Sequence, residues 1–121
     1  MYKIIFYEDD KGQSDLLEWM RDINGRADSG DKNSRILLAK ITYLMRRAEV
    51  DGTRAGEKYC KHIRDKIWEL RPDDHRILFF GWQGNQLVLL TYFQKKQIKT
   101  PLREIEKAEM RMKDWITRFG R

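Results

Sequence analysis

The sequence predicts an α+β domain whose elements follow the order β-α-α-β-β-β-α. Two patterns carry this prediction. Apolar residues recur at helical spacing through most of the first 50 residues, whereas residues 66–93 hold three short apolar or alternating runs that are typical of strands. The length of 121 residues fits a single domain over residues 1–121, with enough chain to bury a core without disulfides or metal.

The first elements are a strand and a helix. Residues 2–7 are mostly β-branched and aromatic, which strands favour. Asp10 and Gln13 have the spacing of a capping box, so we expect the first helix to begin near Asp10. Apolar residues then follow at helical spacing, and Asn24-Gly25 is the expected end of this helix.

A loop and a second helix come next. Residues 26–33 are polar, with Gly and Ser, and predict the loop. Apolar side chains between residues 36 and 48 recur at helical spacing and predict a helix that ends near Gly52. Residues 53–59 are polar, and we expect them to be irregular.

Three strands are expected in the second half of the chain. Residues 66–71 alternate charged and apolar side chains, which suits a half-buried strand. Residues 76–82 and 86–93 are apolar on both faces, so both strands should be central in the sheet. Between them, residues 83–85 contain a Gly and predict a hairpin connection.

The last helix is expected to follow Thr100 and Pro101. A Thr at the N-cap followed by a Pro in the first helical position is a common helix start. Apolar residues at helical spacing, among them Ala108 and Trp115, extend this helix to about Phe119.

Positive charge is concentrated in the second part of the chain. The chain has 25 Lys and Arg against 19 Asp and Glu, a net charge of +6. Residues 1–34 contain 5 basic and 8 acidic groups, residues 35–121 contain 20 and 11, and residues 91–103 contain four basic groups and no acid. A local positive field attracts polyanions, chiefly nucleic acid. The alternative, that these charges only keep the surface solvated, fits the counts equally well.

Several kinds of site lack the residues that they need. Cys60 is the only cysteine and His62 and His75 are the only histidines, so we expect no disulfide and no metal site. The sequence has no glycine-rich phosphate-binding motif and no GxSxG, so we expect no cofactor and no covalent catalysis. It also has no apolar run of membrane-spanning length and no signal-like start, so we expect a cytoplasmic protein without membrane contact.

The remaining chemical feature is a set of cations on and beside the predicted strands. Arg71 and Arg76 flank a tight turn, so strand pairing can bring them together, and Lys95 follows the next strand. Such groups can hold a phosphodiester and stabilise its pentavalent transition state, while RNA supplies its own 2′-OH nucleophile. Glu69 is the candidate carboxylate close to Arg71. We therefore predict that the catalytic residues are Arg71, Arg76, Glu69 and Lys95.

Further residues are predicted to bind RNA by charge or by stacking. Basic side chains would contact phosphates, and Tyr92 would stack on a base. The predicted RNA-binding residues are Lys96, Lys66, Lys61, His62, Tyr92 and Lys99. A structural alternative for the arginines stays open, in which Arg71 and Arg76 only form ion pairs with Glu69, Asp73 and Asp74.

Four short motifs follow one another in the second half of the chain. They are Ile67-Trp68-Glu69-Leu70-Arg71, Arg76-Ile77-Leu78, Phe93-Gln94-Lys95-Lys96 and Thr100-Pro101. Together they resemble the HigB-like, phage-derived branch of the RelE/ParE toxin superfamily. The resemblance is close over residues 58–110, whereas the first 50 residues match only in the order of their elements.

The resemblance implies a RelE-like fold, in which a small antiparallel sheet packs against two N-terminal helices and a C-terminal helix. It also implies the toxin of a type II toxin–antitoxin system, with a helix-turn-helix antitoxin through which alone the toxin reaches operator DNA. RNA-cleaving relatives cut mRNA on the ribosome without a metal, which inhibits translation. In those relatives an Arg at the start of the strand after the turn contacts the scissile phosphate, and Arg76 holds that place here. Lys95 and Lys96 match the basic pair after the following strand, and Arg71 matches the Arg of the preceding strand.

The resemblance leaves the reaction and its proton transfer open. Some relatives use a Tyr or His near the C-terminus as an acid–base group, but this tail offers only Asp114, Trp115 and Phe119. The leading hypothesis is a ribosome-dependent endoribonuclease, an mRNA interferase, which the convergent Arg and Lys residues favour. The alternatives are a ParE-like inhibitor of DNA gyrase without nuclease activity and a nonenzymatic regulator that binds nucleic acid.

Overall fold

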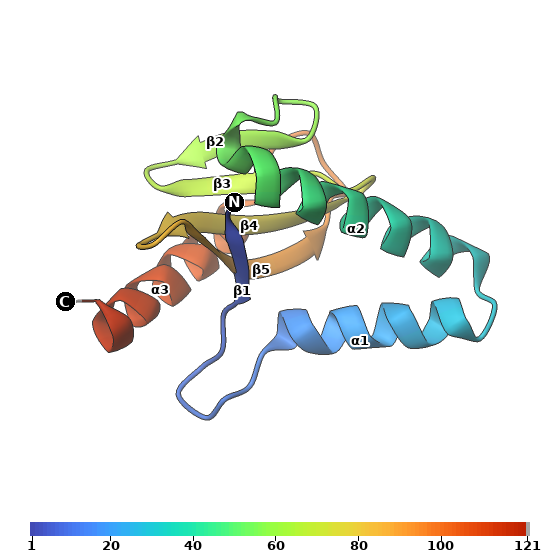
Figure 1. The fold of residues 1–121 in the computed structure, drawn as a ribbon, viewed down its shortest axis with the longest axis horizontal. Helices are drawn as coiled ribbons and strands as arrows, with labels where there is room; N and C mark the ends of the chain where they lie inside the picture. Colours follow the sequence, from blue (N-terminus) through green and yellow to red (C-terminus); the bar gives the residue numbers. More distant parts are fainter. Residues whose placement is uncertain (121) are drawn as a thin grey trace.

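A computed structural model of the protein describes residues 1–120 and shows a five-stranded sheet covered by helices on both faces (Figure 1). The strand order is β1-β5-β4-β3-β2. Helices α1 and α2 form a hairpin on one face, and α3 packs on the other. The elements are β1 (Lys3–Phe6), α1 (Asp15–Asp28), α2 (Lys32–Asp51), the 3-10 turn η1 (Gly52–Arg54), β2 (Cys60–Arg64), β3 (Ile67–Leu70), β4 (His75–Trp82), β5 (Gln86–Gln94) and α3 (Leu102–Phe119).

The α+β class and the central position of the two most apolar strands are confirmed. Strands β4 and β5 pair antiparallel over their whole length, and each has another strand on its outer side. The predicted hairpin connection also lies where expected. Its Gly84 and Asn85 have φ angles of 69° and 58°, a conformation that Gly and Asn adopt most readily in tight hairpin turns.

Two features of the sheet differ from the prediction. An additional strand, β2, pairs antiparallel with β3 and forms one edge of the sheet. Most of its side chains are exposed and polar, with only Cys60 buried, so the strand has little of the apolar pattern that sequence reasoning depends on. At the other edge β1 pairs parallel with β5, and the sheet is therefore mixed rather than antiparallel.

The helices begin and end at positions that partly differ from the prediction. The predicted capping box at Asp10 is wrong, because Ser14 is the N-cap of α1 and its hydroxyl accepts a hydrogen bond from the backbone N–H of Leu17. Helix α1 also continues past Asn24-Gly25 to Asp28. Helix α2 ends at Asp51, as predicted, with Gly52 as its C-cap. Within residues 1–120, no helix combines the length and the hydropathy needed to cross a membrane.

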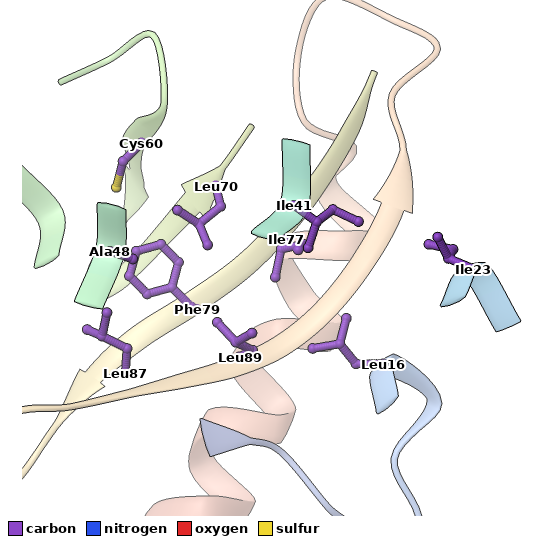
Figure 2. Packing of buried hydrophobic residues seen from close by; sticks show 10 residues of the cluster. All are labelled: Leu16, Ile23, Ile41, Ala48, Cys60, Leu70, Ile77, Phe79, Leu87 and Leu89. Atoms are coloured by element: carbon purple, nitrogen blue, oxygen red, sulfur yellow. The ribbon is translucent and has the colours of Figure 1, made fainter. Parts of the chain in front are cut away.

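The core is divided by the sheet into two layers. Side chains of α1 and α2 pack against one face, and those of α3 pack against the other, because neighbouring residues of a strand point to opposite faces. The buried residues of the first layer, most of them drawn close together in Figure 2, are Leu16, Ile23, Ile41, Ala48, Cys60, Leu70, Ile77, Phe79, Leu87 and Leu89. The second layer contains Tyr7, Ile67, Leu78, Phe80, Val88, Leu90, Phe93, Ala108 and Trp115.

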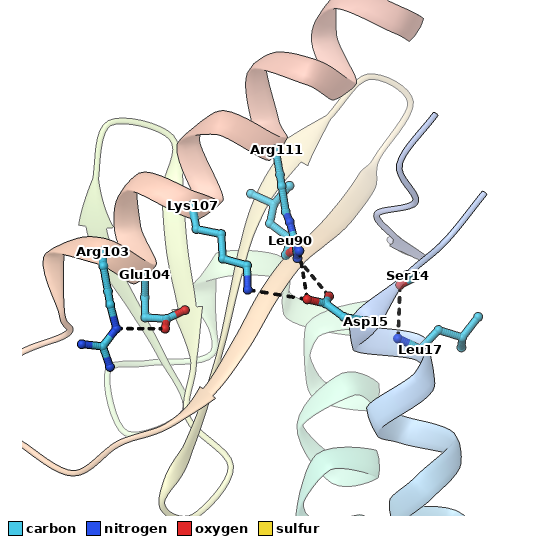
Figure 3. Close-up of polar contacts among 8 residues, drawn as sticks. All are labelled: Ser14, Asp15, Leu17, Leu90, Arg103, Glu104, Lys107 and Arg111. Carbon is cyan, nitrogen blue, oxygen red and sulfur yellow. Dashed lines mark hydrogen bonds and ion pairs between the residues drawn. The ribbon is translucent and has the colours of Figure 1, made fainter. Parts of the chain in front are cut away.

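Arg111 ties α3 to the start of α1 and to the sheet (Figure 3). Its guanidinium donates two hydrogen bonds to the Asp15 carboxylate, at 3.0 and 2.9 Å, and one to the Leu90 carbonyl at 2.7 Å. Lys107 lies 3.6 Å from the same carboxylate. Burial acts to raise the pKa of Asp15, but the hydrogen bonds and charge of Arg111 outweigh it and hold that pKa below its ordinary value of 3.8.

We predict that Asp15→Asn lowers the free energy of unfolding by about 1–2 kcal/mol at neutral pH, because it removes the charge that Arg111 binds. The effect is no larger because Asp15 is partly exposed, so that solvent screens the interaction. Because the pKa of Asp15 is lower in the folded state, its carboxylate stabilises the fold at a pH above the pKa of the unfolded chain. This stabilisation is lost as the pH falls below about 4. Urea unfolding of both proteins at pH 7 and pH 3 checks this, with Asp28→Asn as a control for loss of one acidic charge. An undiminished difference at pH 3 would contradict it.

Candidate functional site

The face of the sheet that carries α3 also positions most of the predicted catalytic residues. Alternation along β3 places Glu69 on the same face as the core residue Ile67, and the side chain after the strand, Arg71, continues that row. Along β4, Arg76 shares its face with Leu78 in the same way. Because Glu69 pairs with Leu78 in the sheet, the carboxylate comes to lie beside Arg76.

Glu69 is a buried carboxylate shared by the two arginines. Its side chain is only 1% exposed, and its Oε1 lies 3.7 Å from Nε of Arg71 and 3.6 Å from Nε of Arg76. The other oxygen, Oε2, accepts a hydrogen bond of 2.6 Å from the hydroxyl of Thr100. One carboxylate therefore faces two guanidinium groups. This cluster of Glu69, Arg71 and Arg76 retains an excess positive charge.

The arginines are also held by backbone carbonyls. Arg71 donates from Nη1 to the carbonyl of Glu57 at 2.9 Å. Arg76 donates from Nη1 to the carbonyls of Asp73 and His75, at 2.8 and 2.7 Å. Neither Nε has a hydrogen-bond partner of its own. Guanidinium groups that are fixed in this way are suited to hold an anion such as a phosphodiester.

The surroundings lower the pKa of two cations in this cluster. Burial lowers the pKa of Arg76, and the charge of Arg71 adds to this while Glu69 opposes it. The pKa of Lys95 is lowered by burial first and then by the charge of Arg76, with Arg71 and Lys61 contributing in the same direction. Both shifts come first from burial and only then from neighbouring positive charge, and an added anion would oppose the second cause.

Lys95 lies at the end of β5, next to the turn between β3 and β4. Its backbone N–H donates to the carbonyl of Asp74 at 2.7 Å. It continues the row of Phe93, which packs on the α3 face. Lys96 and Lys99 are exposed in the loop that follows, and Lys61 pairs with Glu69 from the edge strand β2. The structure thus brings Glu69, Arg71, Arg76, Lys95 and Lys61 together.

Three of the predicted RNA-binding residues lie away from this cluster. Tyr92 stacks on Trp19 of α1, with ring centroids 4.2 Å apart, on the opposite face of the sheet. His62 has its Nε2 2.6 Å from the carbonyl of Asp65 and packs edge-on against Trp68. Lys66 lies in the β2–β3 turn, at the end of β3 far from Arg71. The geometry therefore gives these three side chains no role beside the arginines.

Thr100 is a site residue that sequence reasoning placed elsewhere. The prediction that it caps the last helix is wrong, because Pro101 is the N-cap residue and α3 begins at Leu102. Its hydroxyl instead donates to buried Glu69, which closes the cluster from the loop before α3. Nothing in the local sequence signals this contact, since the two residues are 31 positions apart.

The alternative interpretation of the arginines is correct in part. Both arginines pair with Glu69, but the two acids of the turn have other partners. The Asp73 carboxylate lies 3.1 Å from Nζ of Lys40, and that of Asp74 binds Gln94 and His75. The turn carboxylates therefore form no ion pair with the two arginines, although their charges still act on Arg76 from a distance.

Among the described residues the cluster has no neighbouring group of metal ligands, and the thiol of Cys60 is not activated. Within residues 1–120, no three His, Cys, Asp or Glu side chains gather in a way that could hold a metal ion. Cys60 is buried in the core layer on the opposite face of the sheet, and burial, together with the charge of Glu69, raises its pKa to about 11. Its thiol is therefore neutral at ordinary pH and a poor nucleophile.

Comparisons with known proteins place the chain in a family. The family model described as "Phage derived protein Gp49-like (DUF891)" matches residues 29–113, a range that includes every residue of the cluster. The proteins named "Probable endoribonuclease HigB1" from Mycobacterium tuberculosis strains CDC 1551 / Oshkosh and ATCC 25618 / H37Rv are each 44% identical to this chain over 86 residues. The alignment covers 68% of this chain and 66% of each relative, slightly less than two thirds of their length. The chain therefore belongs to the Gp49-like family of phage-derived proteins, and the resemblance to the HigB-like branch of the RelE/ParE superfamily is confirmed.

Proposed function

We propose that this protein is the toxin of a type II toxin–antitoxin system and that it acts as an endoribonuclease on mRNA at the ribosome. The name of the two relatives supports the class of reaction. The observation that carries the proposal is the pairing of one buried carboxylate, Glu69, with two guanidiniums, Arg71 and Arg76, so that positive charge remains for a phosphate.

The reaction needs little more than charge and proton transfer. The 2′-oxygen of RNA attacks the adjacent phosphorus and the bond from phosphorus to the 5′-oxygen breaks, while the 2′-proton passes to solvent water and the leaving 5′-oxygen gains a proton. Arg71 and Arg76 stabilise the extra negative charge that develops on the phosphoryl oxygens. Lys95, whose pKa is lowered, is our candidate for the proton donor to the 5′-oxygen.

Glu69 is better suited to position the arginines than to take the 2′-proton. It is buried, and both of its oxygens are already engaged, one by the guanidiniums and one by Thr100. A general base must be within hydrogen-bond reach of the proton that it removes. We therefore assign Glu69 the role of a positioning residue.

Mapping of mRNA 5′ ends after induced expression tests the proposed function. Cuts that fall in frame, at codon spacing, are expected from an enzyme that acts on mRNA in the ribosome. The control is expression of the Arg76→Ala variant at the same level. Intact mRNA together with stalled DNA supercoiling would contradict the proposal and indicate gyrase inhibition instead.

We further propose that a helix-turn-helix antitoxin neutralises the protein, and that operator DNA is bound only through this antitoxin. The similarity to proteins named HigB1 supports this expectation. Co-expression with the neighbouring reading frame tests it by rescue of growth. Charge reversal at Lys95 and Lys96 then distinguishes two modes of binding. A marked loss of complex affinity indicates direct masking of the cluster, whereas an unaltered dissociation constant across a salt series indicates docking elsewhere.

We predict that replacing both Lys95 and Lys96 by Ala weakens RNA binding and reduces its dependence on salt. Both lie in the stretch that contains no acid, beside the arginines. Removal of one cation that binds a phosphate of single-stranded RNA lowers the slope of log K against log salt by about 0.7. The measurement is a salt series with a 2′-O-methyl RNA, which lacks the nucleophile and cannot be cut.

The matched control replaces two exposed lysines remote from the cluster, Lys3 and Lys11, by Ala. Lys3 pairs with Gln86, at the opposite end of β5 from Lys95. This control has the same net charge as the double variant. Equal salt slopes for the two proteins would mean that Lys95 and Lys96 only solvate the surface.

A further inference from the structure

A groove of about 350 Å³ lies beside the arginine cluster, between α2 and the segment that leads into β2. Its walls are mainly apolar and include the rings of Tyr43, from α2, and Tyr59, which precedes β2. Arg71 and Pro72 also line it. Arg71 is therefore common to both places, since its guanidinium approaches Glu69 in the cluster and the residue also lines the groove.

The aromatic walls of the groove are held in place by Arg47. The rings of Tyr43 and Tyr59 meet edge to face, with centroids 6.0 Å apart. Arg47 donates to the Tyr43 hydroxyl at 3.0 Å, which lowers the pKa of that phenol, and its guanidinium lies 4.7 Å from the centre of the Tyr59 ring. Rings that are already ordered lose little conformational entropy when a planar ligand stacks on them.

The charge around the groove favours an anionic ligand. Lys40, Lys58 and Arg71 contribute to its lining, and Asp73 is the only acid there. The Asp73 carboxylate is paired with Lys40 at 3.1 Å, so it does not balance the charge of Lys58, while Arg71 shares its charge with Glu69. Aromatic walls with cations at the rim are the combination that binds nucleic-acid bases together with their phosphates.

We propose that this groove binds a nucleobase of the RNA, the one next to the phosphate held by Arg71 and Arg76. The proposal rests on the proposed function and deepens it, because it assigns the place of one nucleotide of the substrate. Tyr43 and Tyr59 contact the base, Lys58 contacts a flanking phosphate, and Arg71 connects the groove to the cluster. An acidic peptide could be attracted by the same cations, so the test includes one.

The test is a titration of the whole protein, followed by NMR chemical shifts, with a 2′-O-methyl RNA tetranucleotide, inorganic phosphate and a hexaglutamate peptide as separate probes. Tyr43→Ala should weaken binding of the tetranucleotide at least about fivefold, since one aromatic platform is removed. Binding of phosphate should be unchanged, because the arginines remain. Tyr43→Phe should bind RNA nearly as well as the wild type, because the ring is retained.

The control is Ile36→Ala, which truncates another exposed side chain of α2 outside the groove. Tyr43 is 49% exposed, so its variants should keep the fold, and thermal unfolding checks this. Unchanged RNA binding by Tyr43→Ala would overturn the proposal. So would hexaglutamate binding that depends on Tyr43 while RNA binding does not, which would assign the groove to an acidic peptide.

These outcomes are separate from those of the proposed function. If the protein makes in-frame cuts in mRNA but its RNA binding does not depend on Tyr43, the groove proposal is wrong and the proposed endoribonuclease function stands. Conversely, if RNA binding depends on Tyr43 but the protein makes no cuts, the groove binds RNA and the proposed endoribonuclease function is wrong.

Discussion

Arg76→Ala is expected to lower the rate of mRNA cleavage about a hundred- to a thousandfold, since it removes a charged donor from the transition state. Arg76 is the more buried of the two arginines, with 12% of its side chain exposed against 25% for Arg71. It is also fixed by two backbone carbonyls and faces Glu69. A guanidinium held so firmly needs no rearrangement to stabilise developing charge. The measurement is single-turnover cleavage of a short mRNA on programmed ribosomes.

Two further variants test whether a lower rate of cleavage by Arg76→Ala reflects loss of the guanidinium group or only loss of one positive charge. Arg76→Lys should also be impaired, because an ammonium group cannot reproduce the planar fork of donors. Arg26→Ala removes an equal charge from an exposed ion pair on α1 and should cleave like the wild type. Full activity of a folded Arg76→Ala protein would exclude Arg76 from the site.

The sequence predicted the parts of the fold whose pattern depends on burial. Residues 76–82 and 86–93 are apolar on both faces because helices cover the sheet on both sides, and they form the central strands β4 and β5. Strand β2 escaped prediction because an edge strand with exposed side chains needs no apolar pattern. The parallel pairing of β1 with β5 is decided by distant contacts, which no local pattern records.

The candidate site was predictable to the extent that it follows from alternation along strands. Arg71 and Arg76 converge because each shares a face with core residues of its own strand. The same rule separates Tyr92 from Lys95, since Tyr92 points to the face covered by α1. The bond from Thr100 to Glu69 depends on how the loop after β5 folds over the sheet, and the sequence carries no signal for it.

Glu69 connects the stability of the protein to its proposed activity. A buried carboxylate between two guanidiniums balances part of their charge in the folded state, and it also occupies part of the positive field that a phosphate would use. A substrate phosphate therefore either competes with the Glu69 carboxylate for the arginines or binds to the positive charge that Glu69 does not balance. The ratio of two arginines to one carboxylate means that charge is left over, with Lys95 beside it.

Glu69→Gln is expected to lower the free energy of unfolding by about 3 kcal/mol. Removal of one partner from a buried ion pair typically costs about 3–5 kcal/mol, and the lower value applies because the arginines are partly reached by water. The amide keeps the shape of the side chain and can still accept from Thr100, so the change in stability reports charge rather than packing. Urea unfolding at neutral pH measures it.

The same variant should gain more stability from inorganic phosphate than the wild type does. With the carboxylate neutralised, the two arginines attract an added anion more strongly, and a ligand that binds only the folded protein stabilises it by mass action. Glu109→Gln is the matched control, because Glu109 pairs with the exposed Arg64 at the surface and its replacement should cost less than about 1 kcal/mol. If Glu69→Gln unfolded like this control and responded to phosphate no more than the wild type, the two arginines would not depend on Glu69 for their charge balance. The cluster would then not be an anion-binding site organised around the Glu69 carboxylate.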